Sequence, residues 1–258
     1  MGNVRIRRRA LAVGSVMAIA AGALVAGQAT TAFAAGNGPA LSTATTSQLQ
    51  VLTIGDSIMR GHGLAEGQAW PLLLASSAGV TVTNSACDGA GVLAVGNPTE
   101  CTGNFGDIVA AASSLHPDIV IFEGSSNDFG LDDSALLAAT VSELAAIRAD
   151  FPDAEIVGLS TLWGYTEPPA QLTDVNSQVE QAVTAVGGAY IDLGQPMQGH
   201  PELMQDDNVH PNAQGQAVLA SAIQTALQPS VNSALQKAQL TAQRLAHMHQ
   251  LLERDLIY

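Results

Sequence analysis

Positive charge is scarce in this chain. Its 258 residues include nine Lys and Arg against 23 Asp and Glu. Four of the nine are arginines among the first nine residues, so the remainder carries five and has a net charge of −18. Such a surface repels phosphate backbones and anionic lipid head groups, which argues against nucleic acid as a partner and against a basic membrane-docking face. Acidity of this kind is also typical of proteins that stay soluble outside the cell.

Cysteine is almost absent, since Cys87 and Cys101 are the only two. Neither belongs to a C-x-x-C pattern or has a nearby histidine, so we expect no metal site. In an exported protein the default is a disulfide between them, and closing this loop is worth roughly 3 kcal/mol in the chain-entropy model. The alternative is a pair of free thiols.

The N-terminus has the layout of a secretory signal. Arg5, Arg7, Arg8 and Arg9 precede the uncharged run "ALAVGSVMAIAAGALVAG", and "TTAFAA" then offers an A-x-A cleavage site ending at Ala34. This pattern predicts a signal peptide over residues 1–34, secretion, and no stable membrane insertion after cleavage. The alternative is an uncleaved anchor, although the run is rich in Ala and Gly rather than Leu. The general and twin-arginine export routes both remain open. Residues 35–47 are small and polar, which predicts a flexible lead-in.

Strand-like and helix-like segments alternate through the rest of the chain. We expect strands over residues 49–55, 80–86, 118–124, 154–160 and 189–194. Helical periodicity covers residues 67–78, 107–116, 134–151, 175–187 and 212–228. This alternation predicts an α/β fold, in which helices cover both faces of a mostly parallel five-stranded sheet.

The stretch "VLTIGDSIMRG" places Ser57 directly after the first expected strand. This serine either caps the next helix or acts as a nucleophile. Ligands bind open parallel sheets at the carboxyl ends of the strands, where "NSACDGAG" and "GSSNDFG" also lie. A serine nucleophile needs a histidine base and an acid to orient it. Of the six histidines, we expect His210 to be the base, because Asp207 precedes it by three residues in a turn-like context. The N–H groups of Ser57 and Gly89 and the side chain of Asn127 are candidate oxyanion donors.

Four short blocks resemble the GDSL or SGNH hydrolases. They are G-D-S-x-x-x-G from Gly55 to Gly61, the glycine of the second block at Gly89, N-D at Asn127 and Asp128, and D-x-x-H-P from Asp207 to Pro211. "LMQDDNVHPN" is similar to the multifunctional thioesterase/lysophospholipase branch. In two places the sequence departs from the family pattern, at Ser125, where Gly is usual, and at "CDGAG".

The resemblance implies a flavodoxin-like three-layer α/β/α sandwich over residues 48–229. Residues 230–258 would then be a C-terminal helical extension. Six apolar residues could form a stripe along it. They are Leu235, Leu240, Leu245, Met248, Leu251 and Leu252. The extension is then a helix packed on the core, a frayed tail, or a helix that binds a second copy or another partner. We make no prediction of oligomeric state.

The function implied is that of a secreted serine esterase or lipase without a cofactor. It would act on a small-molecule, lipid or acylated-carbohydrate ester with an acetyl or a short or medium acyl group, through the triad of Ser57, His210 and Asp207 and an acyl-enzyme. Trp163 and Tyr165 either line the acyl pocket or pack within their loop. The competing hypotheses are an acyltransferase that uses the same triad and a non-catalytic secreted binding module of the same fold.

Overall fold

Five parallel strands form the centre of the fold. The computed structural model describes residues 48–99 and 101–255, so the predicted signal peptide and lead-in lie outside the described residues. The strands are β1 (Gln50–Ile54), β2 (Thr81–Asn84), β3 (Ile119–Glu123), β4 (Glu155–Leu159) and β5 (Ala189–Ile191). Their order in the sheet is β2-β1-β3-β4-β5, and every neighbouring pair is parallel. The predicted five-stranded α/β fold is confirmed.

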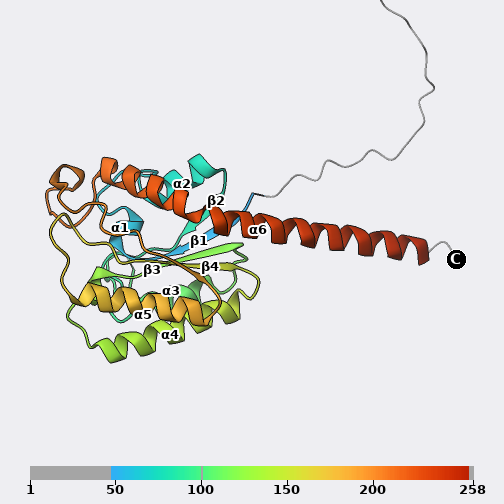
Figure 1. Ribbon diagram of the computed structural model, residues 1–258, viewed down its shortest axis with the longest axis horizontal. Helices are drawn as coiled ribbons and strands as arrows, with labels where there is room; N and C mark the ends of the chain where they lie inside the picture. Colours follow the sequence, from blue (N-terminus) through green and yellow to red (C-terminus); the bar gives the residue numbers. More distant parts are fainter. Residues whose placement is uncertain (1–47, 100, 256–258) are drawn as a thin grey trace, which may run out of the picture. The chain divides into compact units, whose positions relative to one another are not determined.

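Helices cover both faces of this sheet (Figure 1). The helices α2 (Trp70–Ala78) and α6 (Ala213–Asp255) pack on one face. The helices α3 (Phe105–Ala112), α4 (Asp133–Asp150) and α5 (Gln171–Ala185) pack on the other. Neighbouring residues of a strand point to opposite faces, and β3 therefore supplies Val120 and Phe122 to one core cluster and Ile119 and Ile121 to the other. No helix in the described part of the chain is long and apolar enough to cross a membrane.

Local capping explains where α3 begins. The sequence predicts this helix over residues 107–116, but it spans Phe105–Ala112. Asn104 accepts a hydrogen bond from the Asp107 N–H, and the Asp107 carboxylate accepts one from the Asn104 N–H. This capping box satisfies N–H groups that the first turn of a helix leaves without partners, so it fixes the start of α3.

The last helix does not end at Pro229. The helix predicted over residues 212–228 and the predicted extension form the single helix α6, with Pro229 inside it, although proline has no N–H to donate to the preceding turn. Contacts with the sheet continue beyond the proline. Ser233 donates to the Glu155 carboxylate at 2.6 Å, and the Lys237 ammonium lies 2.7 Å from the same group. The predicted boundary at residue 229 therefore falls within one continuous helix.

Candidate active site

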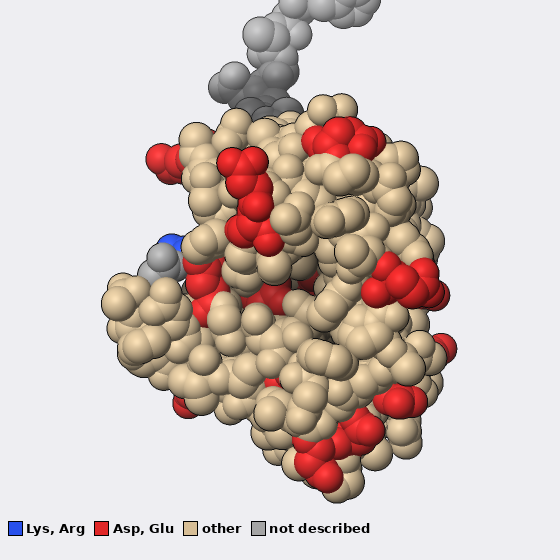
Figure 2. Space-filling view, turned by 90° about the vertical axis from the view of Figure 1, so that its left-hand side faces the viewer, with Lys and Arg blue, Asp and Glu red and all other residues tan. Residues whose placement is uncertain are grey.

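The carboxyl ends of β1, β2 and β3 bring three of the four sequence blocks together. Asp56 and Ser57 follow β1, Gly89 lies in the turn after β2, and Asn127 lies in the short helix η1 (Ser126–Asp128) after β3. The fourth block occupies the loop between η2 (Pro201–Leu203) and α6. Figure 2 looks onto this edge of the domain, where acidic residues are scattered across the surface and a hollow lies near the centre.

Ser57 is the first residue of the short helix α1 (Ser57–Arg60). Asp56 caps this helix by accepting a hydrogen bond of 2.9 Å from the Ile58 N–H. Burial acts to raise the pKa of Asp56, opposed by hydrogen bonds from Ser125 and Ile58, and the net shift is upward. The Ser57 side chain is buried apart from a small fraction, and its Oγ lies 2.9 Å from His210 Nε2. Ser57 therefore both begins a helix and presents its hydroxyl to an imidazole.

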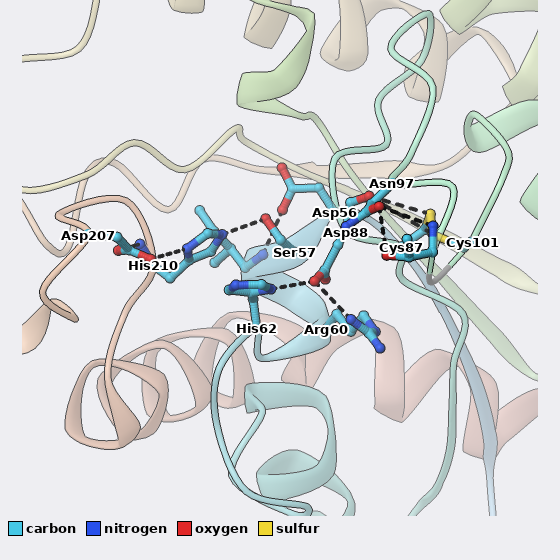
Figure 3. A network of polar contacts seen from close by, with 12 residues as sticks. Asp56, Ser57, Arg60, His62, Cys87, Asp88, Asn97, Cys101, Asp207 and His210 are labelled. Atoms are coloured by element: carbon cyan, nitrogen blue, oxygen red, sulfur yellow. Dashed lines mark hydrogen bonds and ion pairs between the residues drawn. A yellow bond between two sulfur atoms is a disulfide. The ribbon is translucent and has the colours of Figure 1, made fainter.

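Asp207 holds the other nitrogen of His210. Its Oδ2 lies 2.7 Å from His210 Nδ1, while Oδ1 accepts the N–H groups of Val209 and His210 at 2.9 and 3.0 Å. Partial burial acts to raise the pKa of Asp207, but these hydrogen bonds outweigh it and lower the pKa to about 2. Asp207 is therefore a carboxylate at neutral pH. The three side chains form a chain from Asp207 through His210 to Ser57 (Figure 3).

A cavity of about 250 Å³ opens beside Ser57. The other two expected oxyanion donors, Gly89 and Asn127, also line it. Asn127 donates from Nδ2 to the Ala90 carbonyl at 2.9 Å, which fixes the amide and leaves its second N–H available. Gly89 has a φ of +75°, a conformation that favours glycine. Ser57, Gly89 and Asn127 thus border one space.

Ser125 links three of the blocks at once. Its buried hydroxyl lies 2.7 Å from Asp56 Oδ2 and 2.9 Å from the Ala90 carbonyl, and it accepts the Asn127 N–H at 3.1 Å. The sequence shows this residue only as a departure from the family pattern. In the structure it ties the nucleophile turn to the loop that carries Asn127.

Comparison with known proteins identifies the family. The model of the GDSL-like lipase/acylhydrolase family matches residues 53–218. The chain belongs to this family. The GDSL lipase Rv0518 of Mycobacterium tuberculosis is 30% identical over 190 residues, which cover 67% of this chain and 79% of that protein. This GDSL-family chain is therefore a carboxylic ester hydrolase.

Solved structures share the fold of this hydrolase at lower sequence identity. A carbohydrate esterase family 2 enzyme from Corynascus thermopiles (Myceliophthora fergusii) is 22% identical with a TM-score of 0.60, covering 74% of this chain and 69% of that one. The psychrotrophic esterase EstA from Pseudoalteromonas sp. is 17% identical with a TM-score of 0.58, covering 71% of this chain and 98% of that one.

The GDSL hydrolase has further polar residues at the site that sequence reasoning missed. Asp88 lies 2.8 Å from an Arg60 guanidinium nitrogen and also contacts His62 Nδ1. The His62 ring faces the His210 ring at 4.4 Å between centroids. Two signals in the sequence point to these residues. They are His62 directly after the last glycine of the first block and the aspartate directly before Gly89.

Trp163 and Tyr165 are not among the residues that line the cavity at Ser57. Trp163 packs edge-on against Phe129, with 5.9 Å between ring centroids, and its indole N–H donates to Thr166. Tyr165 packs at the edge of the core on the α2 and α6 side. The side chains that border the cavity are mostly polar, with Ile58 and Val209 as the large apolar ones.

The hydrolase contains the Cys87–Cys101 disulfide, with 5.9 Å between the two Cα atoms. Between these cysteines, the Asn97 N–H donates to the Asp88 carbonyl at 2.7 Å, so the loop closes over the turn that carries Gly89. Within the ranges that the structure describes, no three His, Cys, Asp or Glu side chains gather as metal ligands.

Proposed function

We propose that this GDSL-family hydrolase is a secreted serine esterase that uses Ser57, His210 and Asp207. The observation that carries the proposal is the unbroken hydrogen-bonded chain, 2.7 Å from Asp207 to His210 and 2.9 Å from His210 to Ser57. A serine that only capped a helix would not need an imidazole at its hydroxyl, because Asp56 already caps α1.

In this proposal His210 Nε2 takes the Ser57 proton as Oγ attacks the ester carbonyl. The backbone N–H groups of Ser57 and Gly89 and the side-chain amide of Asn127 stabilise the resulting oxyanion. His210 then gives the proton to the oxygen of the leaving alcohol, the C–O bond breaks, and the acyl group stays on Ser57. Water, deprotonated by the same imidazole, cleaves this acyl-enzyme and regenerates the serine. Asp207 stays ionised throughout and stabilises the transient imidazolium.

We further propose a neutral ester with an acetyl, short or medium acyl chain as the substrate. A cavity of about 250 Å³ suits a small acyl group better than a long chain. The five basic residues outside the proposed leader stand against 23 acidic ones, which disfavours anionic phospholipids. Polar side chains in the lining, among them Asn97 and Ser126, offer hydrogen bonds to a hydroxylated alcohol such as the sugar of an acylated carbohydrate.

Hydrolysis is preferred to acyl transfer because the cavity beside Ser57 is open to solvent, from which water would reach an acyl group on this serine. The Asp207 side chain is 41% exposed, and Val209, which lines the cavity, is exposed as well. An acyltransferase needs water to be excluded from its acyl-enzyme. A sugar or lipid acceptor that captured the acyl group in preference to water would overturn this part of the proposal.

A chain-length series of 4-nitrophenyl esters tests the function, with a thioester and acetylated xylan alongside. We expect kcat/KM to be highest at short or medium acyl length and Ser57→Ala to lower kcat by roughly 10³-fold or more at an unchanged thermal midpoint. Activity of Ser57→Ala within about tenfold of wild type would reject this nucleophile, and preference for long-chain anionic lipid would reject the substrate class. Mass spectrometry of the exported protein tests the secretion proposal, with Ala35 as the expected first residue.

A further inference from the structure

A second histidine lies against the proposed base of this hydrolase. We propose that His62 is a positioning residue that holds the His210 imidazole in the orientation needed for proton transfer. The inference rests on the proposed function, because it assigns His62 a role in the same reaction. Figure 3 shows the His62 ring beside His210, with Asp88 and Arg60 on the side away from His210.

The backbone of His62 is tied to both partners of the proton transfer. Its N–H donates to the carbonyl of Ser57 at 3.0 Å, and its carbonyl accepts the Gln205 side-chain amide at 2.7 Å. The Gln205 N–H in turn donates to the His210 carbonyl at 2.8 Å. The flanking Gly61 and Gly63 have φ values of +80° and +74°, which other residues rarely adopt. The chain is therefore bent on both sides of His62, and this residue connects the nucleophile turn with the His210 loop.

The side chain of His62 is also held in place. Its Nδ1 contacts the carboxylate of Asp88, whose side chain is only 6% exposed and also pairs with Arg60 at 2.8 Å. Asp88 follows Cys87 of the disulfide, and its carbonyl accepts the Asn97 N–H. The ring thus has a buried, fixed support on the side remote from His210. A histidine whose side chain only contacted solvent would not need such a support.

His210 benefits from this contact because its own loop is exposed. Contacts with Asp207 and Ser57 hold the two ring nitrogens. The contact with Ser57 is lost once Oγ has attacked the ester, and the ring can then tilt about the hydrogen bond to Asp207. The His62 ring, 4.4 Å away and inclined at 35°, limits this tilt from one face. Nε2 must point first at Ser57 Oγ and then at the oxygen of the leaving alcohol, and a misplacement of about 1 Å can cost about 10²-fold in rate.

The test compares two substitutions that separate the ring from its hydrogen bond. His62→Phe keeps a flat ring against His210 without the bond to Asp88, and His62→Gln keeps a polar group for Asp88 without the ring. His62→Ala removes both, and His200→Ala serves as the matched histidine control. The readout is kcat/KM for 4-nitrophenyl acetate and for ethyl acetate, which give the same acetyl-enzyme and therefore differ only in acylation.

We expect the Ala and Gln variants to lose roughly 10- to 100-fold in kcat/KM on ethyl acetate and clearly less on 4-nitrophenyl acetate. The ethoxide must receive a proton from His210, whereas 4-nitrophenolate leaves without one. His62→Phe should recover most of the loss. A merely structural role would lower both rates by one common factor, together with the thermal midpoint.

Three results would overturn the inference. They are equal losses on the two esters, a Phe variant as impaired as the Gln variant, or variants indistinguishable from wild type. If His62→Ala does not fold, the comparison of Phe with Gln still decides. Failure of the proposed function is recognised separately, because Ser57→Ala would then retain activity whatever the His62 variants did.

Discussion

Four histidines in the described part of the chain lie beside a carboxylate, and one of them, His249 next to Glu253, belongs to the far end of α6. His200 pairs with Glu202 at 2.8 Å, and His62 pairs with Asp88, as well as His210 with Asp207. A neighbouring carboxylate therefore does not by itself distinguish the base from the other histidines. The distinguishing feature is instead the 2.9 Å contact between His210 Nε2 and Ser57 Oγ.

This contact predicts different outcomes for two alanine substitutions. His210→Ala should lower kcat by roughly 10³-fold or more, because no other imidazole replaces the base. His200→Ala should leave kcat nearly unchanged, since its side chain is about half exposed and pairs only with an exposed glutamate. Steady-state kinetics on one short-chain ester, with thermal midpoints for both variants, checks this. The opposite ranking would move the base to His200.

Glu143 on α4 is a buried carboxyl group outside the site. Burial is the main cause that raises its pKa to about 8, the charge of Asp128 adds to this, and a hydrogen bond from the Gly106 N–H opposes it. In the unfolded chain the group has its ordinary pKa of 4.5. Between these two values the unfolded state loses the proton first, so stability falls as pH rises from about 4.5 to about 8 and then levels off.

We therefore predict that Glu143→Gln stabilises the protein at pH 8 and leaves it nearly unchanged at pH 4. At about 1.4 kcal/mol per pH unit, the difference in the free energy of unfolding should be on the order of a few kcal/mol at pH 8. Urea unfolding at the two pH values measures it. Glu123, also buried with a raised pKa, is common to both proteins and cancels in the comparison. A difference that does not change with pH would contradict the prediction.

At the scale of elements, the disulfide loop joins the fold to the oxyanion donors. Cys87 precedes Asp88 and Gly89, and the Asn97 N–H binds the Asp88 carbonyl from within the loop. The Asp128 carboxylate fixes the next turn by accepting the N–H groups of Val92, Leu93 and Ala94 at 2.7, 3.0 and 2.9 Å. Loss of the disulfide removes one restraint from the first of these turns, while Asp128 still anchors the second.

Reduction should therefore lower kcat at temperatures where the protein stays folded. We expect a decrease on the order of tenfold, because one oxyanion donor loses its fixed position. The Cys87→Ser/Cys101→Ser variant is the control, with the same reduced kcat and no response to reductant. Circular dichroism confirms that the fold persists in each sample. Two titratable thiols in the untreated protein, or full activity after complete reduction, would contradict this.

At the scale of the whole molecule, α6 extends beyond its contacts with the domain. Ala234 is buried, and Lys237 still pairs with Glu155. Further along, large apolar residues are exposed, namely Leu240, Leu245, Met248, Leu251 and Leu252. The first part of the predicted extension thus packs on the core, and the apolar stripe of the second part faces outward.

We predict that truncation after Gln239 leaves kcat/KM and the thermal midpoint nearly unchanged. The removed turns make few contacts with the domain, so little buried apolar area is lost. A second truncation after Gln228 is the destabilising comparison, because it removes Ala234 and the salt bridge to Glu155. Sedimentation of the full and shortened chains tests the partner-helix alternative. A full-length dimer that becomes a monomer on truncation would show that the outward stripe mediates self-association.

The sequence by itself determined the alternation of strands and helices, the parallel sheet and the residues of the four blocks. These are short-range signals, because periodicity repeats within a few residues and Asp207 lies three residues from His210. The tertiary structure decided which side chains pair at the site and what else lies between the blocks. Ser57 and His210 are 153 positions apart, Asp56 and Ser125 are 69 apart, and His62 and Asp88 are 26 apart. Contacts at such separations depend on how strands and helices pack, and local sequence patterns predict the edge of the sheet where the blocks lie but not which side chains pair there.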